Sequence, residues 1–133
     1  MTLDVTTLVL DSEGLSAWIA QDRSVMAVLK VLDGHGAEFV VCANTIVEAT
    51  HARVNMPRLD WVLSQVKVEP VTEQLAKAAA RLLKGAGLHG HKYAIDATVA
   101  ATALRQPGPV AVLTSDTDDM ARLCGPGVRL VGL

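Results

Sequence analysis

The sequence has few aromatic residues, few cysteines and no long hydrophobic run. Its four aromatic side chains are Trp18, Phe39, Trp61 and Tyr93. So few rings make it unlike proteins that stack single-stranded bases on an aromatic platform. Neither Cys42 nor Cys124 belongs to a CxxC pair, which points to a reducing, cytoplasmic setting rather than to a disulfide scaffold. No apolar run approaches the length of a membrane span, so no membrane partner is expected.

Several motifs are also missing. A GxxxxGK[ST] phosphate-binding loop is absent, which argues against a nucleoside triphosphatase. The first residues carry no basic run ahead of an apolar stretch, so no signal peptide is expected. We find no repeat, linker or low-complexity segment, and half of the residues are apolar. The 133 residues therefore predict one ordered domain, 1–133, with a full core.

Buried strands alternate with helices along the chain. Apolar, β-branched runs predict strands at 7–10, 39–42, 110–114 and 128–131, and the alternating run 66–70 predicts an edge strand. Helical spacing fills the intervals, near 15–19, 24–32, 44–48 (opening at Asn44 or Thr45), 57–63, 72–85, 93–104 and 116–123. This order predicts an α/β fold: a central parallel sheet of four to five strands covered by helices on both faces. Ligands of such sheets bind beyond the carboxyl ends of the strands.

The stretch 93–104 is almost wholly apolar or small, and Asp96 is its only charged residue. Both helix faces beside Asp96 are apolar, so its carboxylate is expected to point into a mostly buried wall. A buried carboxylate is costly unless it is paired, protonated or bound to a metal. The structural alternative is that Asp96 lies in the first turn and stabilises the helix dipole.

Other acids are expected at the same edge of the sheet. Asp11 directly follows the first strand, Asp116 follows the strand 110–114, and Glu48 lies in the helix after the second strand. Asp119 is one helical turn beyond Asp116. Each has a structural alternative: Asp11 and Asp116 as helix N-caps, and Glu48 as part of a capping box that begins at Thr45.

Together these acids are difficult to explain by capping alone. Two carboxylates about 4 Å apart repel by about 4 kcal/mol at an effective dielectric near 20. A cluster therefore needs a cation or raised pKa values, and oxygen ligands suit Mg²⁺ or Mn²⁺. Such sites activate water for in-line phosphoryl displacement. The formal net charge of −2 argues against a nucleic-acid partner. If the five site acids are set aside, the remaining nine acidic and twelve basic residues give a charge of +3, so the surface outside the site is expected to be mildly basic.

Four motifs resemble the PIN-domain ribonucleases, especially the small VapC-type toxins of toxin–antitoxin pairs. They are Leu8-Val9-Leu10-Asp11-Ser12, Thr45-Ile46-Val47-Glu48, the segment 94–104 around Asp96, and Thr114-Ser115-Asp116 followed by Asp119. Two positions depart from the family pattern. Glu13 replaces a small polar residue and adds charge near the site, and Met120 replaces the more usual Phe or Leu.

The resemblance implies a metal-dependent endoribonuclease. Asp11, Glu48, Asp96 and Asp116 would hold Mg²⁺ or Mn²⁺ directly or through water, with Asp119 as a helper. A metal-bound water would cleave RNA to leave a 5′-phosphate and a 3′-hydroxyl, while Ser12 or Thr114 would orient a carboxylate or contact the phosphate. The resemblance also implies a homodimer and a small antitoxin that inserts a segment into the cleft.

Some residues and functions stay open at this stage. Lys92 and Arg53 are candidate phosphate contacts at the rim, with solvated positions as the alternative. His89 and His91 have no third ligand at zinc spacing and are expected in a flexible polar loop over 87–92. The alternative functions are a PIN-like binding protein without catalysis and, less favoured, a phospho-acceptor regulatory domain. The latter needs a lysine after a late strand, and no lysine follows Lys92.

Overall fold

A computed structural model describes residues 4–133, so Met1–Leu3 of the predicted domain lie outside the described part. The strands are β1 (Thr7–Leu10), β2 (Glu38–Cys42), β3 (Lys67–Glu69), β4 (Val110–Thr114) and β5 (Arg129–Gly132). The helices are α1 (Ser12–Ile19), α2 (Arg23–Gly34), α3 (Ala43–Ala49), α4 (Met56–Ser64), α5 (Glu73–Ala86), α6 (Gly90–Leu104) and α7 (Thr117–Cys124). A short 3₁₀ turn, η1 (Gly125–Gly127), precedes β5.

The strands form one five-stranded parallel sheet in the order β3-β2-β1-β4-β5. This confirms the predicted α/β architecture, including β3 at an edge. In register, Leu10 at the end of β1 lies opposite Val41 of β2 and Leu113 of β4. The strand order reverses at the central strand β1, because β2 lies on one side of it and β4 on the other. The carboxyl end of β1 is therefore the place where such sheets open a binding crevice.

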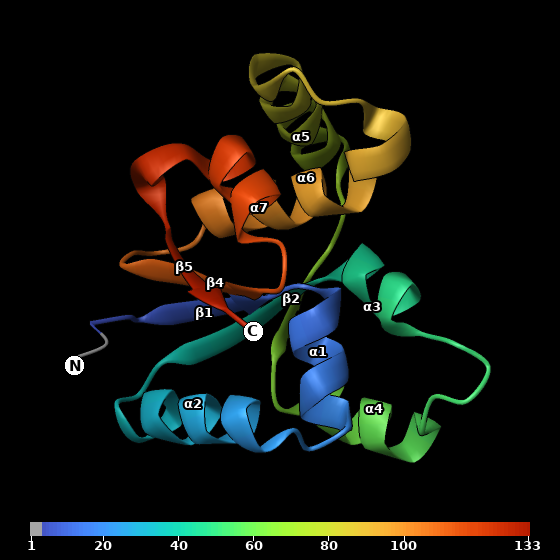
Figure 1. The fold of residues 1–133 in the computed structure, drawn as a ribbon, viewed down its shortest axis with the longest axis vertical. Coiled ribbons are helices and arrows are strands. Elements are labelled where there is room, and N and C mark those ends of the chain that lie inside the picture. The colour runs from blue at the N-terminus through green and yellow to red at the C-terminus, as the bar shows by residue number, and fades with distance from the viewer. Residues whose placement is uncertain (1–3) are drawn as a thin grey trace.

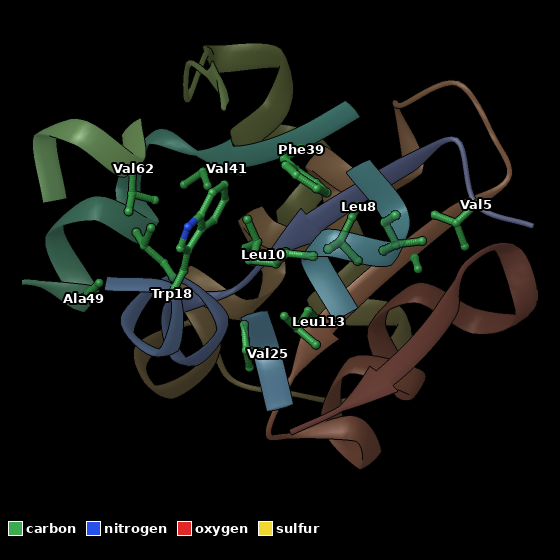
Figure 2. Close-up of a cluster of buried hydrophobic side chains, with 14 of the residues drawn as sticks. Val5, Leu8, Leu10, Trp18, Val25, Phe39, Val41, Ala49, Val62 and Leu113 are labelled. Carbon is green, nitrogen blue, oxygen red and sulfur yellow. The ribbon is translucent and has the colours of Figure 1, made fainter. Parts of the chain in front are cut away.

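Helices cover both faces of the sheet, with α1, α2 and α4 on one side and α5, α6 and α7 on the other (Figure 1). The strands alternate accordingly: Leu8 and Leu10 join the first core, whereas Val9 joins the second. Figure 2 shows the first core, in which Trp18 of α1 meets Phe39 edge to face at 5.5 Å. Within residues 4–133 we find no helix with the length and apolar character that a membrane crossing requires.

Two predicted helix starts were wrong. α3 begins at Ala43, directly after β2, and not at Asn44 or Thr45. α6 begins at Gly90, so the polar loop predicted at 87–92 is shorter and its last residues form a helical turn. The non-helical backbone of Tyr93 (φ −113°, ψ 16°) separates that turn from the rest of α6. The apolar 94–104 pattern marks only the second part of the helix, because the first turn is exposed and polar.

Candidate functional site

A polar cleft of about 340 Å³ opens at the carboxyl ends of β1, β2 and β4. It is lined by side chains that come from four separate segments of the chain. These are Asp11, Ser12, Glu13, Ser16, Glu48, Asp96, Ser115 and Asp116. The cleft thus brings together four of the five predicted site acids at the edge where the sequence placed them, together with Ser12.

Asp11 has both of the roles that the sequence left open. Its Oδ1 accepts a hydrogen bond of 2.9 Å from the Gly14 backbone N–H, which caps α1. At Gly14 a Cβ would lie 3.1 Å from the Leu113 carbonyl oxygen, so a larger residue would disturb the contact of α1 with β4. Burial raises the pKa of Asp11, and hydrogen bonds from Thr114 and Gly14 partly oppose this effect. Asp11 is therefore a helix cap that also lines the cleft.

Asp116 is the N-cap of α7 and accepts a long hydrogen bond of 3.4 Å from the Asp119 backbone N–H. The Asp116 N–H in turn donates to Thr114 Oγ1 at 3.0 Å. Asp119 does not line the cleft, but its side chain contacts Asp116, and this contact raises the pKa of Asp119. Thr114 is fully buried, so its hydroxyl can hold the Asp11 carboxylate and the Asp116 backbone N–H but cannot contact a substrate.

Glu48 and Asp96 face the cleft from the two remaining helices, α3 and α6. The capping box proposed for Glu48 is wrong, because α3 begins two residues before Thr45 and the buried Thr45 hydroxyl has no hydrogen-bond partner within residues 4–133. Glu48 instead lies exposed near the end of α3.

Asp96 is half-buried and is the third residue of the part of α6 that follows the kink at Tyr93. Desolvation raises its pKa to about 6, and the charges of Glu48, Asp116, Asp11 and Asp119 contribute to the rise. Asp96 thus keeps the first-turn position of the structural alternative and also lines the cleft.

The donor set fits a hard divalent cation, because carboxylate and hydroxyl oxygens line the cleft and no soft ligand does. In the described part of the chain, no three Asp, Glu, His or Cys side chains already converge around one point. The acids line an open cleft instead of forming a closed cage. Such an arrangement suits an ion that keeps part of its water shell, as Mg²⁺ usually does.

The predicted basic rim residues and the histidines lie outside the cleft. Arg53 lines a neighbouring hollow of about 330 Å³, which shares Ser16 with the cleft. Lys92 lies 5.2 Å above the Tyr93 ring, and its charge lowers the pKa of Asp119, so it stands near the α7 side of the rim. His89 and His91 are exposed at the start of α6.

Sequence reasoning did not single out Ser16 and Ser115, although both line the cleft. Ser16 is one helical turn after Ser12 on α1, and Ser115 lies between the strand β4 and Asp116. These positions next to the recognised motifs could have been used to predict both serines as cleft residues. A third residue, Asn44, contacts Thr98 across α3 and α6, and only the folded arrangement reveals this contact.

Comparisons with known proteins agree with this geometry. A chain of the structure described as VapBC2 from Rickettsia felis bound to a DNA fragment from their promoter superposes with a TM-score of 0.66 and 14% identity, over 96% of this chain and 98% of that one. A chain of a toxin–antitoxin complex from Klebsiella pneumoniae gives a TM-score of 0.66 and 20% identity, over 91% of this chain and 94% of that one.

At such low sequence identities, the TM-scores of these two structures show a shared fold and no more. No curated protein matches the chain significantly. The family model described as PIN domain matches residues 8–126, which span β1 to the end of the α7 region and contain all five acids. The chain therefore belongs to the PIN domain family.

Proposed function

We propose that this protein is a metal-dependent endoribonuclease and the toxin of a toxin–antitoxin pair. The observation that carries the proposal is the convergence of Asp11, Glu48, Asp96 and Asp116 on one cleft at the carboxyl edge of a PIN domain. These four residues would hold Mg²⁺ or Mn²⁺, with Asp119 acting through Asp116. When bound, the ion supplies an activated water and neutralises charge at the phosphate.

The chain's own residues prepare the cleft for that chemistry. Thr114 and the Gly14 N–H hold Asp11 and oppose the rise of its pKa, which keeps its carboxylate available as a ligand. Ser12 reaches the cleft beside Asp11 and is positioned to donate a hydrogen bond to a phosphate oxygen. Lys92 and Arg53 lie beyond the acids, where their charges would attract the RNA backbone toward the cleft.

The proposed partner is a small antitoxin protein, and the proposed assembly is a homodimer in the cytoplasm. Structures of toxin–antitoxin complexes share the fold of this chain. A basic side chain of the antitoxin would be attracted by the cluster of carboxylates in the cleft, which explains how such a partner would inhibit cleavage. The alternative, a PIN-like binding protein without catalysis, is disfavoured because every proposed acid ligand is present.

The test is cleavage of a transfer-RNA pool by the purified protein with Mg²⁺ or Mn²⁺ and with EDTA. We expect metal-dependent cleavage that leaves 5′-phosphate and 3′-hydroxyl ends. Asp116→Asn should abolish it. The matched control is Asp118→Asn, two residues further along in the first turn of α7, because Asp118 is exposed and does not line the cleft. Equal activity of Asp116→Asn and wild type would refute the proposed site.

A further inference from the structure

A second hollow, of about 540 Å³, adjoins the carboxylate cleft. Glu13, Ser16 and Ser115 line both spaces, so one groove runs from the acids into this hollow. Its other walls come from α1, α2, the end of β4 and the end of β5. In Figure 1 the C-terminal end of β5 points toward α1 and α2. The volume lies within the range of about 300–1,000 Å³ usual for small-ligand sites.

The walls of the hollow are apolar and anionic. Val25, Val28 and Leu113 supply the apolar surface, and Glu13 and Asp22 supply two carboxylates. No lysine, arginine or histidine is among the residues that line it. Neither of the two ion pairs in the part of the chain that the structure describes involves these carboxylates. A phosphate would therefore be repelled here, whereas an uncharged group with an apolar body and hydrogen-bond donors at its edge fits.

Hydrogen-bonding groups are placed around the same space. Ser16 and Ser115 stand where the hollow meets the cleft, and Ser24 lies at the far side on α2. Asp22 already accepts the Val25 N–H at 3.1 Å, which caps α2 and fixes its carboxylate in place. The polar groups are thus mostly acceptors or hydroxyls held on two helices that meet near Asp22.

We propose that this hollow is a subsite for one unstacked nucleobase next to the phosphate that would be cleaved. The inference rests on the proposed function and adds to it the recognition of a base. Single-stranded RNA is commonly read by bases that turn outward and offer their edges to the protein. Carboxylate acceptors pair with the exocyclic amines of cytosine and adenine. Uracil has no exocyclic amine, so the hollow should discriminate against it.

The test is titration of the metal-free protein, in EDTA, with the uncharged nucleosides adenosine, cytidine and uridine, followed by amide chemical shifts. We expect adenosine and cytidine to shift the amides around Ser24 and Val28, and to bind at least about threefold more tightly than uridine. Val28→Phe fills the hollow and should weaken binding at least about tenfold. The matched control is Val31→Phe on the same helix, because Val31 is 49% exposed and lines no part of the hollow.

A second variant blocks the hollow from an exposed position, so the test does not depend on whether Val28→Phe folds. Ser24 is exposed, so Ser24→Trp should fold normally and also block the nucleosides. Glu13→Ala should reduce the preference of cytidine over uridine to less than about twofold, because the side-chain acceptor is lost. Absence of shifts, or shifts that persist in Val28→Phe and Ser24→Trp, would overturn the proposal.

The nucleoside titration and the RNA cleavage assay can fail independently, so failure of the base subsite is distinguishable from failure of the proposed nuclease function. RNA cleavage without nucleoside binding would refute the base subsite alone. Nucleoside binding at the hollow without RNA cleavage would support the subsite and refute the nuclease. A hollow that takes up a segment of a protein partner but no nucleoside would likewise overturn the base subsite and identify the surface as a protein interface.

Discussion

The Thr98 hydroxyl of α6 lies 3.0 Å from Oδ1 of Asn44 on α3 and 2.7 Å from the Ile95 carbonyl oxygen, so these two acceptors share its one proton. Thr98 is buried and lies two residues after Asp96, while Asn44 lies four residues before Glu48 and therefore on the same helical face. The bond thus joins the two helices that present Asp96 and Glu48 to the cleft. We infer that it positions these two carboxylates relative to each other.

Thr98→Val should loosen this connection. The substitution removes the donor and leaves Asn44 without this partner, so we expect the free energy of unfolding to fall by about 1 kcal/mol. If the bond also positions the acids, the affinity for Mn²⁺ should fall severalfold, and Thr98→Ser should restore it. Calorimetric titration measures the affinity. A variant that loses stability but keeps the affinity of wild type would limit the bond to a structural role.

Thr114→Val should affect two acids at once. The buried Thr114 hydroxyl accepts the Asp116 N–H and opposes the rise in the pKa of Asp11. Removing it leaves an N–H without its partner, at a cost of about 2 kcal/mol in the free energy of unfolding. Because the pKa of Asp11 then rises further, metal affinity should suffer more in mildly acid than in mildly alkaline buffer. Thr114→Ser should show neither effect, and similar pH profiles for the valine variant and wild type would contradict the proposed link.

Asp96→Asn should stabilise the metal-free protein at neutral pH. The pKa of Asp96 is raised from 3.8 to about 6 by burial and by the neighbouring acids, so the folded protein binds this proton more tightly than the unfolded chain does. Its stability therefore falls as the pH rises between these two values. A difference of that size corresponds to about 3 kcal/mol, which partial exposure reduces to about 1 kcal/mol.

Urea unfolding in EDTA measures this gain. The variant should exceed wild type by about 1 kcal/mol near pH 7.5 and by only a small fraction of this near pH 3.5, where both states mostly bind the proton. Asp60→Asn on the exposed face of α4 is the control. A constant difference at both pH values would show that packing, and not charge, explains the effect.

Metal binding should weaken as the pH falls through about 6. Protons compete with the ion for Asp96, whose raised pKa is about 6, so the apparent affinity should fall by up to about tenfold for each pH unit below that value. Mn²⁺ titrations between about pH 5 and 7.5 test this dependence. Asp118→Asn should follow the wild-type curve. An affinity that does not change over this range would mean that Asp96 does not hold the ion.

The sequence predicted the parallel sheet because the buried strands are apolar on both faces, as in Val110–Thr114. It predicted the acid edge because Asp11 and Asp116 follow strands directly. These inferences needed only local pattern and the geometry of parallel sheets. The role of Asp11 as a cap and a cleft residue shows that the two interpretations offered for it were compatible.

The remaining features depend on contacts that local patterns do not encode. The start of α3 was misplaced because Thr45 and Glu48 imitate a capping box, whereas the helix begins as soon as β2 ends. Trp61 has the helical spacing of a packing or dimer contact, and in the single chain it is 47% exposed under the Arg58 guanidinium at 4.5 Å. The Thr98–Asn44 bond joins residues 54 positions apart. Only the packing of α3 against α6 brings them together.

The measurement that tests the central claim most directly is RNA cleavage by wild type and Asp96→Asn, side by side, with saturating Mg²⁺ and with EDTA. We predict that wild type cleaves only with the ion and that the variant is slower by about 100-fold or more, since loss of a direct ligand should cost at least as much as loss of an outer-shell group. Cleavage that persists in EDTA, or that proceeds equally fast in the variant, would contradict the carboxylate cleft as the site of the reaction.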